Sequence, residues 1–347
     1  MDSITQAALG AAIGEAALGH KVGWRGALWG GALATIPDLD VIVSPLLETT
    51  QRLAWHRGPS HSVFVLLLLG PLVGWALHRF FREKYDISRV RWMVTSTVAF
   101  LSQPFLDVLT SYGTNVFWPV VPRPIEYSTI SIIDPIYTAI LFVGLGVALW
   151  SEVGSRRRFV VGALTLALST GYIGLLAGFK SQATDVFRAE LARQNIEYSR
   201  LETHPGFFNS IFWQGYADSG DDFYVGIYSL LDEDRRVDFI RVDKNRELIE
   251  PFLDEKPVQN LLRFSRGLYS IRQVDGKLVF EDLHIGRQDQ WLADSQKAVF
   301  RFELVPSADD PDTLNGVEEL ERDGDISDEA IQRYIDRVKG DRVKGEE

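Results

Sequence analysis

The pattern of apolar and polar positions divides the chain into two unlike parts. Before residue 180, uncharged apolar stretches alternate with short charged segments, and four of them approach or reach the length of a bilayer: Ser62–Leu77, Trp92–Leu106, Pro135–Ser151 and Phe159–Phe179. A helix crosses the hydrocarbon core with about 20 mostly apolar residues, and interfacial Trp and His side chains extend the shorter stretches. We therefore predict an α-helical, multi-pass membrane domain over residues 1–179.

Two shorter apolar segments precede these stretches, Ile4–Leu18 and Gly26–Ile36. Both are rich in small residues, which recur at a spacing of four within each segment: Gly10 and Gly14 in the first, and Gly26, Gly30 and Ala34 in the second. Small residues at this spacing let two helix backbones approach closely in a bilayer. We predict a tight helical hairpin with its turn at His20–Arg25.

The part from residue 180 onwards is polar. Ser181–Tyr198 has helical spacing, and the later strand-like runs are Phe207–Trp213, Phe223–Leu231, Val237–Val242, Leu268–Val274, Lys277–Leu283 and Ala298–Leu304. Asp275-Gly276 between two such runs predicts a hairpin. We predict a smaller α+β domain over residues 180–306, in which His204 and His284 stand isolated. Residues 307–347 form an acidic tail, mobile over Ser307–Ile326 and with one short helix at Ser327–Val338.

Charge sharpens this division. Residues 1–179 hold 13 Lys and Arg against 11 Asp and Glu, whereas the remainder holds 23 against 36, and the whole chain carries a formal net charge of −11. This balance excludes a strongly basic nucleic-acid binder, so we expect no nucleic-acid partner. The chain has no cysteine, which excludes a disulfide scaffold, a thiolate zinc site and a cysteine nucleophile.

Short basic loops predict the orientation in the membrane. The segments 79–91 and 151–158 are rich in Lys and Arg, and such loops lie on the cytoplasmic side. Two predicted crossings separate them, so the two assignments agree. The α+β domain after residue 180 is then extracytoplasmic.

The unusual polar residues of the membrane part all fall on the opposite, outer side. They are Asp38 and Asp40 in PDLD, His56, Arg57 and His61 in HRGPSH, Asp107 at the end of an apolar stretch, and Asp134 at the start of another. Ionisable residues at membrane depth are costly and usually mark function, and Asp and His are ligands of zinc and similar ions. Gly58-Pro59 disfavours a helix through the two histidines, so a turn can direct both to one centre. Arg57 can hold a phosphate or a carboxylate of a substrate.

Each residue also has a structural interpretation. Asp38 or Asp40 can cap a helix or shape a turn, and the two histidines can be interfacial. Asp107 can bond to the Thr110 or Ser111 amides, and Asp134 before a proline can be an N-cap. The case for a site depends on these residues meeting on one face.

Several motifs together resemble a known family. The opening MDSITQAALGAAIGEAALG, then PDLD, HRGPSHS, FLDVLTSYGT and IIDP resemble, in order over about residues 1–150, the YdjM-like family of bacterial inner-membrane proteins, described as metal-dependent hydrolases. The resemblance implies an inner-membrane location. It also implies metal-site roles for the residues that match the family's motifs: Asp38, Asp40, His56, His61 and Asp107. Two positions depart from the pattern, since Gln103 and Gln6 stand where family members have histidine.

The leading functional hypothesis is a membrane-bound hydrolase that uses a metal-activated water. Asp38, Asp40, His56, His61 and Asp107 hold a divalent ion, for which Asp and His ligands indicate zinc, and Arg57 binds the substrate. Gln103 makes a harder ion with oxygen ligands a second possibility. The substrate is a lipid or envelope ester or phosphoester, and the partners are membrane lipids. The alternative is a non-catalytic membrane protein with a structural ion or polar site, whose acidic outer domain binds a protein. A transporter ranks last, because the polar residues cluster at helix ends rather than at mid-membrane.

Overall fold

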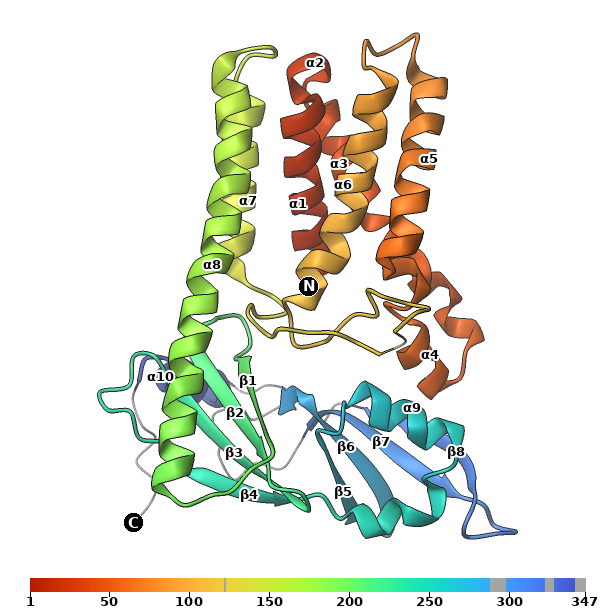
Figure 1. Ribbon diagram of the computed structural model, residues 1–347, viewed down its shortest axis with the longest axis vertical. Helices are drawn as coiled ribbons and strands as arrows, with labels where there is room; N and C mark the ends of the chain where they lie inside the picture. Colours follow the sequence, from red (N-terminus) through yellow and green to blue (C-terminus); the bar gives the residue numbers. More distant parts are fainter. Residues whose placement is uncertain (122, 288–297, 322–327, 341–347) are drawn as a thin grey trace. The chain divides into compact units, whose positions relative to one another are not determined.

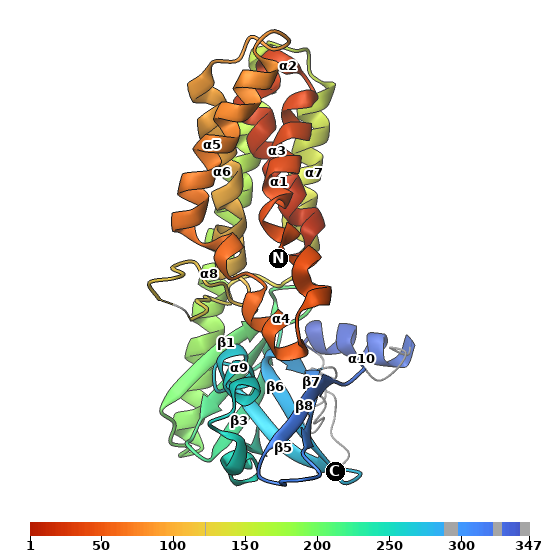
Figure 2. The same ribbon diagram turned by 90° about the vertical axis from the view of Figure 1, so that its right-hand side faces the viewer.

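The protein is described by a computed structural model that covers residues 1–121, 123–287, 298–321 and 328–340. The chain divides into two compact units. The first comprises residues 1–46 and 55–176, and the second comprises residues 47–54 together with the chain from 177 onwards. Figures 1 and 2 show the helices and strands of each unit.

The first unit is a bundle of helices that run alongside one another (Figures 1 and 2). Its main helices are α1 (Ser3–Gly14), α3 (Arg25–Thr35), α5 (Val63–Phe81), α6 (Arg89–Val108), α7 (Pro135–Trp150) and the first part of α8 (Arg156–Arg193). The four long predicted apolar stretches coincide with α5, α6, α7 and α8 apart from terminal residues, and the two shorter ones coincide with α1 followed by η1 (Glu15–Gly19) and with α3. The prediction of a helical N-terminal half is therefore confirmed.

Two of these helices, α5 and α8, are long and apolar enough to cross a membrane. A third candidate is the pair formed by α3 and the 3-10 segment η2 (Pro37–Leu46), which is bent by 41°. α7 is an apolar helix of 16 residues, shorter than a full span. The number of crossings and their orientation stay predictions.

The predicted hairpin is confirmed at α1 and α3, which pack backbone against backbone. A Cβ added to Gly14 would lie 2.2 Å from the carbonyl oxygen of Gly26 and 2.6 Å from the Cα of Gly30. Likewise, a Cβ added to Gly30 would lie 2.1 Å from the Gly10 carbonyl oxygen. Between the two helices the chain passes through a π-helical segment, η1 (Glu15–Gly19), and the short α2 (His20–Val22).

A buried ion pair ties η1 to the start of α8. Arg158 donates from Nε to Glu15 Oε1 at 2.5 Å and from Nη2 to Glu15 Oε2 at 2.8 Å. Both side chains are almost fully buried. Arg158, at the end of the basic segment 151–158, thus turns inward, whereas Arg156 and Arg157 stay exposed.

The second unit contains two four-stranded antiparallel sheets, with strand orders β1-β2-β3-β4 and β5-β6-β7-β8. The first sheet consists of β1 (Arg200–Pro205), β2 (Phe212–Asp218), β3 (Asp222–Ser229) and β4 (Phe239–Asp243). The second consists of β5 (Tyr269–Val274), β6 (Lys277–Arg287), β7 (Ala298–Pro306) and β8 (Leu314–Glu319). The hairpin predicted at Asp275-Gly276 joins β5 to β6, where Val274 pairs with Lys277.

Helices accompany the sheets in this unit. The end of α8 packs Ala183, Val186 and Phe187 against the first sheet at Trp213 and Tyr228. The second sheet packs against η4 (Arg246–Phe252) and α9 (Lys256–Phe264). α10 (Asp328–Val338) agrees with the predicted last helix, whose first residue lies outside the described residues. α4 (Thr49–Trp55) supplies Leu53 to the core beside α9.

Two predictions for this part of the chain are wrong in detail, and one strand was not predicted. The run Phe207–Trp213 is mostly a turn region before β2, and the preceding strand β1 was missed because its polar sequence RLETHP lacks clear alternation. β8 lies inside the acidic stretch predicted to be mobile, since pairing with β7 overrides its polar composition.

The two histidines predicted to stand isolated have carboxylate partners. His204 Nε2 lies 3.2 Å from Glu202 Oε2, and His284 Nδ1 contacts Asp282 Oδ1. Burial raises the pKa of the Glu202 carboxyl, but His204 and the nearby Arg266 and Arg200 outweigh it, so that pKa lies well below its usual range.

Candidate metal centre

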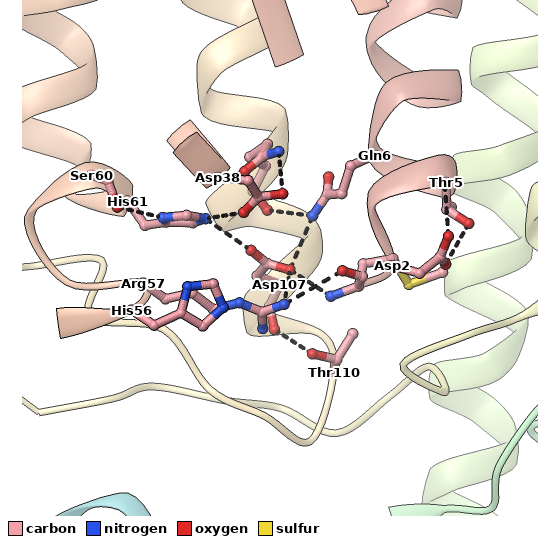
Figure 3. A network of polar contacts seen from close by, with 12 residues as sticks. Asp2, Thr5, Gln6, Asp38, His56, Arg57, Ser60, His61, Asp107 and Thr110 are labelled. Carbon is pink, nitrogen blue, oxygen red and sulfur yellow. Dashed lines mark hydrogen bonds and ion pairs between the residues drawn. The ribbon is translucent and has the colours of Figure 1, made fainter. Parts of the chain in front are cut away.

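Three segments of the first unit bring two carboxylates and one imidazole together. His61 Nε2 lies 3.3 Å from Asp38 Oδ1 and 3.3 Å from Asp107 Oδ2. The three ligand atoms lie within 4.8 Å of one another, a spacing at which they could hold one metal ion. His61 and Asp107 are fully buried, and the Asp38 side chain is 20% exposed. Figure 3 shows this cluster and its neighbours.

Asp38 and His61 lie where regular α-helix is interrupted, and these interruptions bring them to the cluster. α3 ends at Thr35, and η2 begins at Pro37 and carries Asp38. On the other side, Gly58-Pro59 separates α4 from α5, as predicted, and the 3-10 turn η3 (Pro59–His61) ends on His61. Arg57 has a φ of 56°, in the left-handed region that non-glycine residues rarely adopt. Asp107 lies one residue before the end of α6, four residues after Gln103 and therefore on the same helix face.

Asp40 anchors the turn that carries His61. Its Oδ2 accepts hydrogen bonds from the Arg57 amide at 2.9 Å and from Ser60 Oγ at 2.8 Å, and its Oδ1 lies 3.1 Å from His56 Nδ1. Asp40 thus shapes a turn, which is the structural interpretation considered for it. Asp40 and His56 lie beside the Asp38–His61–Asp107 cluster and are not part of it.

The hydrogen bonds around Ser60 determine which nitrogen of His61 carries its proton. An ionised carboxylate only accepts hydrogen bonds, so the Ser60 hydroxyl donates to Asp40. The Ser60 oxygen, 2.9 Å from His61 Nδ1, is then left to accept a hydrogen bond from that nitrogen. In neutral imidazole the proton therefore sits on Nδ1, and the lone pair of Nε2 faces Asp38 and Asp107.

Asp107 is held through one of its two oxygens. Oδ1 accepts from the Met1 amino group at 2.6 Å and from Gln6 Nε2 at 3.0 Å, and it lies 3.2 Å from Arg57 Nη2. Asp107 does bond to the Thr110 amide, as considered from the sequence, but through its main chain: the Thr110 amide and hydroxyl both donate to the Asp107 carbonyl oxygen. Oδ2 is left facing His61.

Arg57 packs beside the cluster, and some of its N–H donors have no partner among the described residues. Its guanidinium carbon lies 4.5 Å from the centre of the Tyr112 ring. Nη2 is engaged with Asp107 and the Met1 carbonyl oxygen, whereas Nε and Nη1 are buried without a hydrogen-bond partner among the described residues. Buried donors of this kind call for a ligand or a water molecule.

The remaining residues considered from the sequence are outside the cluster. Asp134 is the N-cap of α7, with its Oδ1 accepting from the Tyr137 amide at 2.9 Å, so its structural interpretation is confirmed. The contacts of Ser60 with Asp40 and His61 were not predicted, although its position between His56 and His61 in HRGPSH was a signal. The contacts of Gln6 and Gln103 with the two aspartates were not predicted either.

The atoms that face the centre of the cluster are suited to binding a cation. His61 Nε2 and Asp107 Oδ2 are buried and have no hydrogen-bond partner in the part of the chain that the structure describes. Both atoms present lone pairs, and the lone pair of His61 faces two carboxylate oxygens. Such a cluster is electrostatically unfavourable unless a proton or a metal ion lies within it.

Comparison with known proteins matches the first part of the chain to a family. A family model described as YdjM inner membrane protein matches residues 1–180, which include the whole cluster. No curated protein and no solved structure matches the chain.

Proposed function

We propose that this chain, which belongs to the YdjM inner membrane protein family, is a membrane-bound hydrolase that uses a divalent metal ion to activate water. The observation that carries the proposal is the convergence of His61 Nε2 with the Asp38 and Asp107 carboxylates. Three protein ligands with a further position left for water are typical of catalytic metal sites.

The chain's own residues have distinct roles in this proposal. Asp38, His61 and Asp107 hold the ion, for which zinc is our first expectation, and a bound zinc ion lowers the pKa of a coordinated water to about 7. Asp40, through Ser60, keeps the lone pair of His61 on the ligand side. Arg57 offers its unpartnered Nε and Nη1 donors to an anionic group of the substrate.

The surroundings of the site favour a substrate from the membrane. Asp38 and Asp40 belong to η2, which also carries exposed apolar side chains: Leu39 is 52% exposed, Ile42 68% and Leu46 84%. Exposed apolar patches mark interaction sites, and in a membrane protein such a surface fits lipid tails. We propose a lipid-derived or envelope ester or phosphoester as the substrate. We also propose that the protein crosses the membrane several times and that its site and its second unit face the extracytoplasmic side.

A second candidate function is non-catalytic. Asp107 already has the Arg57 guanidinium within 3.2 Å, so a polar network can stabilise the helix ends without turnover. In that case the ion or proton at His61 is structural, and the acidic second unit binds a protein partner.

The decisive experiment measures metal content, activity and stability on the same variants. We expect purified protein to contain one divalent ion per chain, and His61→Ala and Asp107→Asn to lose both the ion and hydrolysis of generic esters and phosphoesters. Asp86→Asn, which changes an exposed aspartate far along the sequence from these motifs, is the control and should retain both. A wild-type protein without a stoichiometric ion would contradict the hydrolase proposal, and variants that lose only thermal stability would favour the structural alternative.

A further inference from the structure

Two buried glutamines stand at the positions where the family resemblance places histidine, and each contacts one of the aspartates. We infer that Gln103 and Gln6 are positioning residues, which fix the oxygen that each aspartate presents to the ion. This inference rests on the proposed metal site. It differs from the view that the glutamines are weakened ligands, and it assigns them a role through their amide nitrogens.

Gln103 holds Asp38. Its Nε2 donates to Asp38 Oδ2 at 3.0 Å, while the other oxygen, Oδ1, lies 3.3 Å from His61 Nε2. Gln103 is fully buried on α6, so its amide group is held by packing. The hydrogen bond occupies Oδ2 and leaves Oδ1 turned towards the imidazole.

Gln6 holds Asp107 in the same manner. Its Nε2 donates to Asp107 Oδ1 at 3.0 Å, and Asp107 Oδ2 lies 3.3 Å from His61 Nε2. Gln6 is also fully buried, on α1. The two carboxylates are therefore related by the same arrangement, in which one oxygen accepts from a glutamine and the other faces His61. Figure 3 shows Gln6, Asp107, Asp38 and His61.

The chemistry of the groups determines which end of each amide faces the aspartate. A carboxylate oxygen accepts hydrogen bonds and has none to donate, so the NH₂ end of the amide must face it. Hydrogen bonds to the remaining oxygen of a ligating carboxylate orient that ligand, and removing one such partner typically costs about 10–100-fold in metal affinity.

The two aspartates differ in how many groups besides the glutamine contact their non-ligating oxygen. Besides Gln6, Asp107 Oδ1 has two further neighbours, the Met1 amino group and Arg57, both of which are positively charged. For Asp38 Oδ2, Gln103 is the one hydrogen-bond donor within the described residues. Loss of Gln103 should therefore weaken metal binding more than loss of Gln6.

The test uses Co²⁺ as the probe on full-length protein in detergent. The variants are Gln103→Met, which keeps the length of the side chain and removes its amide, Gln103→Asn, which keeps a polar amide one methylene short of Asp38, and Gln6→Met. Gln51→Met is the matched control, because Gln51 donates to Glu48 Oε2 at 3.2 Å on an exposed surface. The dissociation constant is measured by chelator competition, the visible absorption spectrum is recorded at saturation, and circular dichroism of the metal-free protein checks folding.

We expect both Gln103 variants to raise the Co²⁺ dissociation constant about 10–100-fold, Gln6→Met to raise it less, and Gln51→Met to leave it unchanged. The spectrum at saturation should stay that of the wild type, because the ligands are unchanged. An unchanged dissociation constant in folded Gln103→Met would overturn the inference while the metal site stands. A changed spectrum would overturn it too, since Gln103 would then be a ligand. If wild-type protein binds no Co²⁺, the proposed function and this inference both fail.

Discussion

At the scale of single residues, Asp38 and Asp40 lie two positions apart in one motif and have different contacts. Asp38, His61 and Asp107 were named as ligands, and the structure brings them together. Asp40 was also predicted to be a ligand, because two carboxylates two residues apart look equivalent in a sequence. In a 3-10 segment, with three residues per turn, positions two apart point in different directions. Asp40 accordingly contacts Ser60 and the Arg57 amide.

Ser60 gives a prediction at this scale. Ser60→Ala removes the acceptor of the His61 Nδ1 proton, so the imidazole loses the contact that fixes its tautomer and orientation. We expect metal affinity to fall about 10-fold or more, with one ion still bound at saturation. Ser60→Thr retains the hydroxyl and should restore most of the affinity. Titration with Co²⁺ checks both variants, and equal affinities for wild type and Ser60→Ala would show that Asp40 and Ser60 do not act on His61.

At the scale of elements, the spacing of small residues predicted the α1–α3 hairpin, because two helix backbones can approach this closely only where the side chains between them are small or missing. The helix backbones occupy the space that Cβ atoms would fill at Gly14 and Gly30. Strand boundaries in the second unit were harder to predict. β1 and β8 are polar, and their hydrogen-bonded neighbours, β2 and β7, determine their conformation. Pairing between strands leaves little trace in the sequence of either strand alone.

The hairpin gives the second prediction. Gly14→Ala places a methyl group 2.2 Å from the Gly26 carbonyl oxygen, so α1 and α3 must separate, at a cost of about 1–3 kcal/mol for overpacking. Gly146→Ala is the control, because no atom lies within 4 Å of a Cβ added there and alanine favours helix more than glycine does. Thermal unfolding in detergent should show a lower midpoint for Gly14→Ala and an equal or higher one for Gly146→Ala. Equal midpoints for the wild type and Gly14→Ala would argue against the close approach of the helices.

At the scale of the whole molecule, two chemically different units share one chain. The first is close to neutral and rich in apolar helix, while the second contains most of the acidic excess. The basic segments 79–91 and 151–158 each lie between consecutive helices, α5 and α6 in one case and α7 and α8 in the other. Because short basic loops are retained in the cytoplasm, both loops would lie on the same, inner side.

The last prediction follows from that charge distribution. α8 starts with Arg156–Arg158 and runs on as an apolar helix long enough to cross a bilayer, so a chain that enters α8 from the cytoplasm leaves it on the other side. A reporter that is active only in the cytoplasm should be silent when fused after Glu347, whereas one that is active only outside should work there. The same two reporters inserted after Lys84, in the loop between α5 and α6, should give the opposite pattern. This paired design separates orientation from expression, because each position has one active fusion. A cytoplasmic signal at Glu347 would reverse the orientation and place the metal site on the inner face of the membrane.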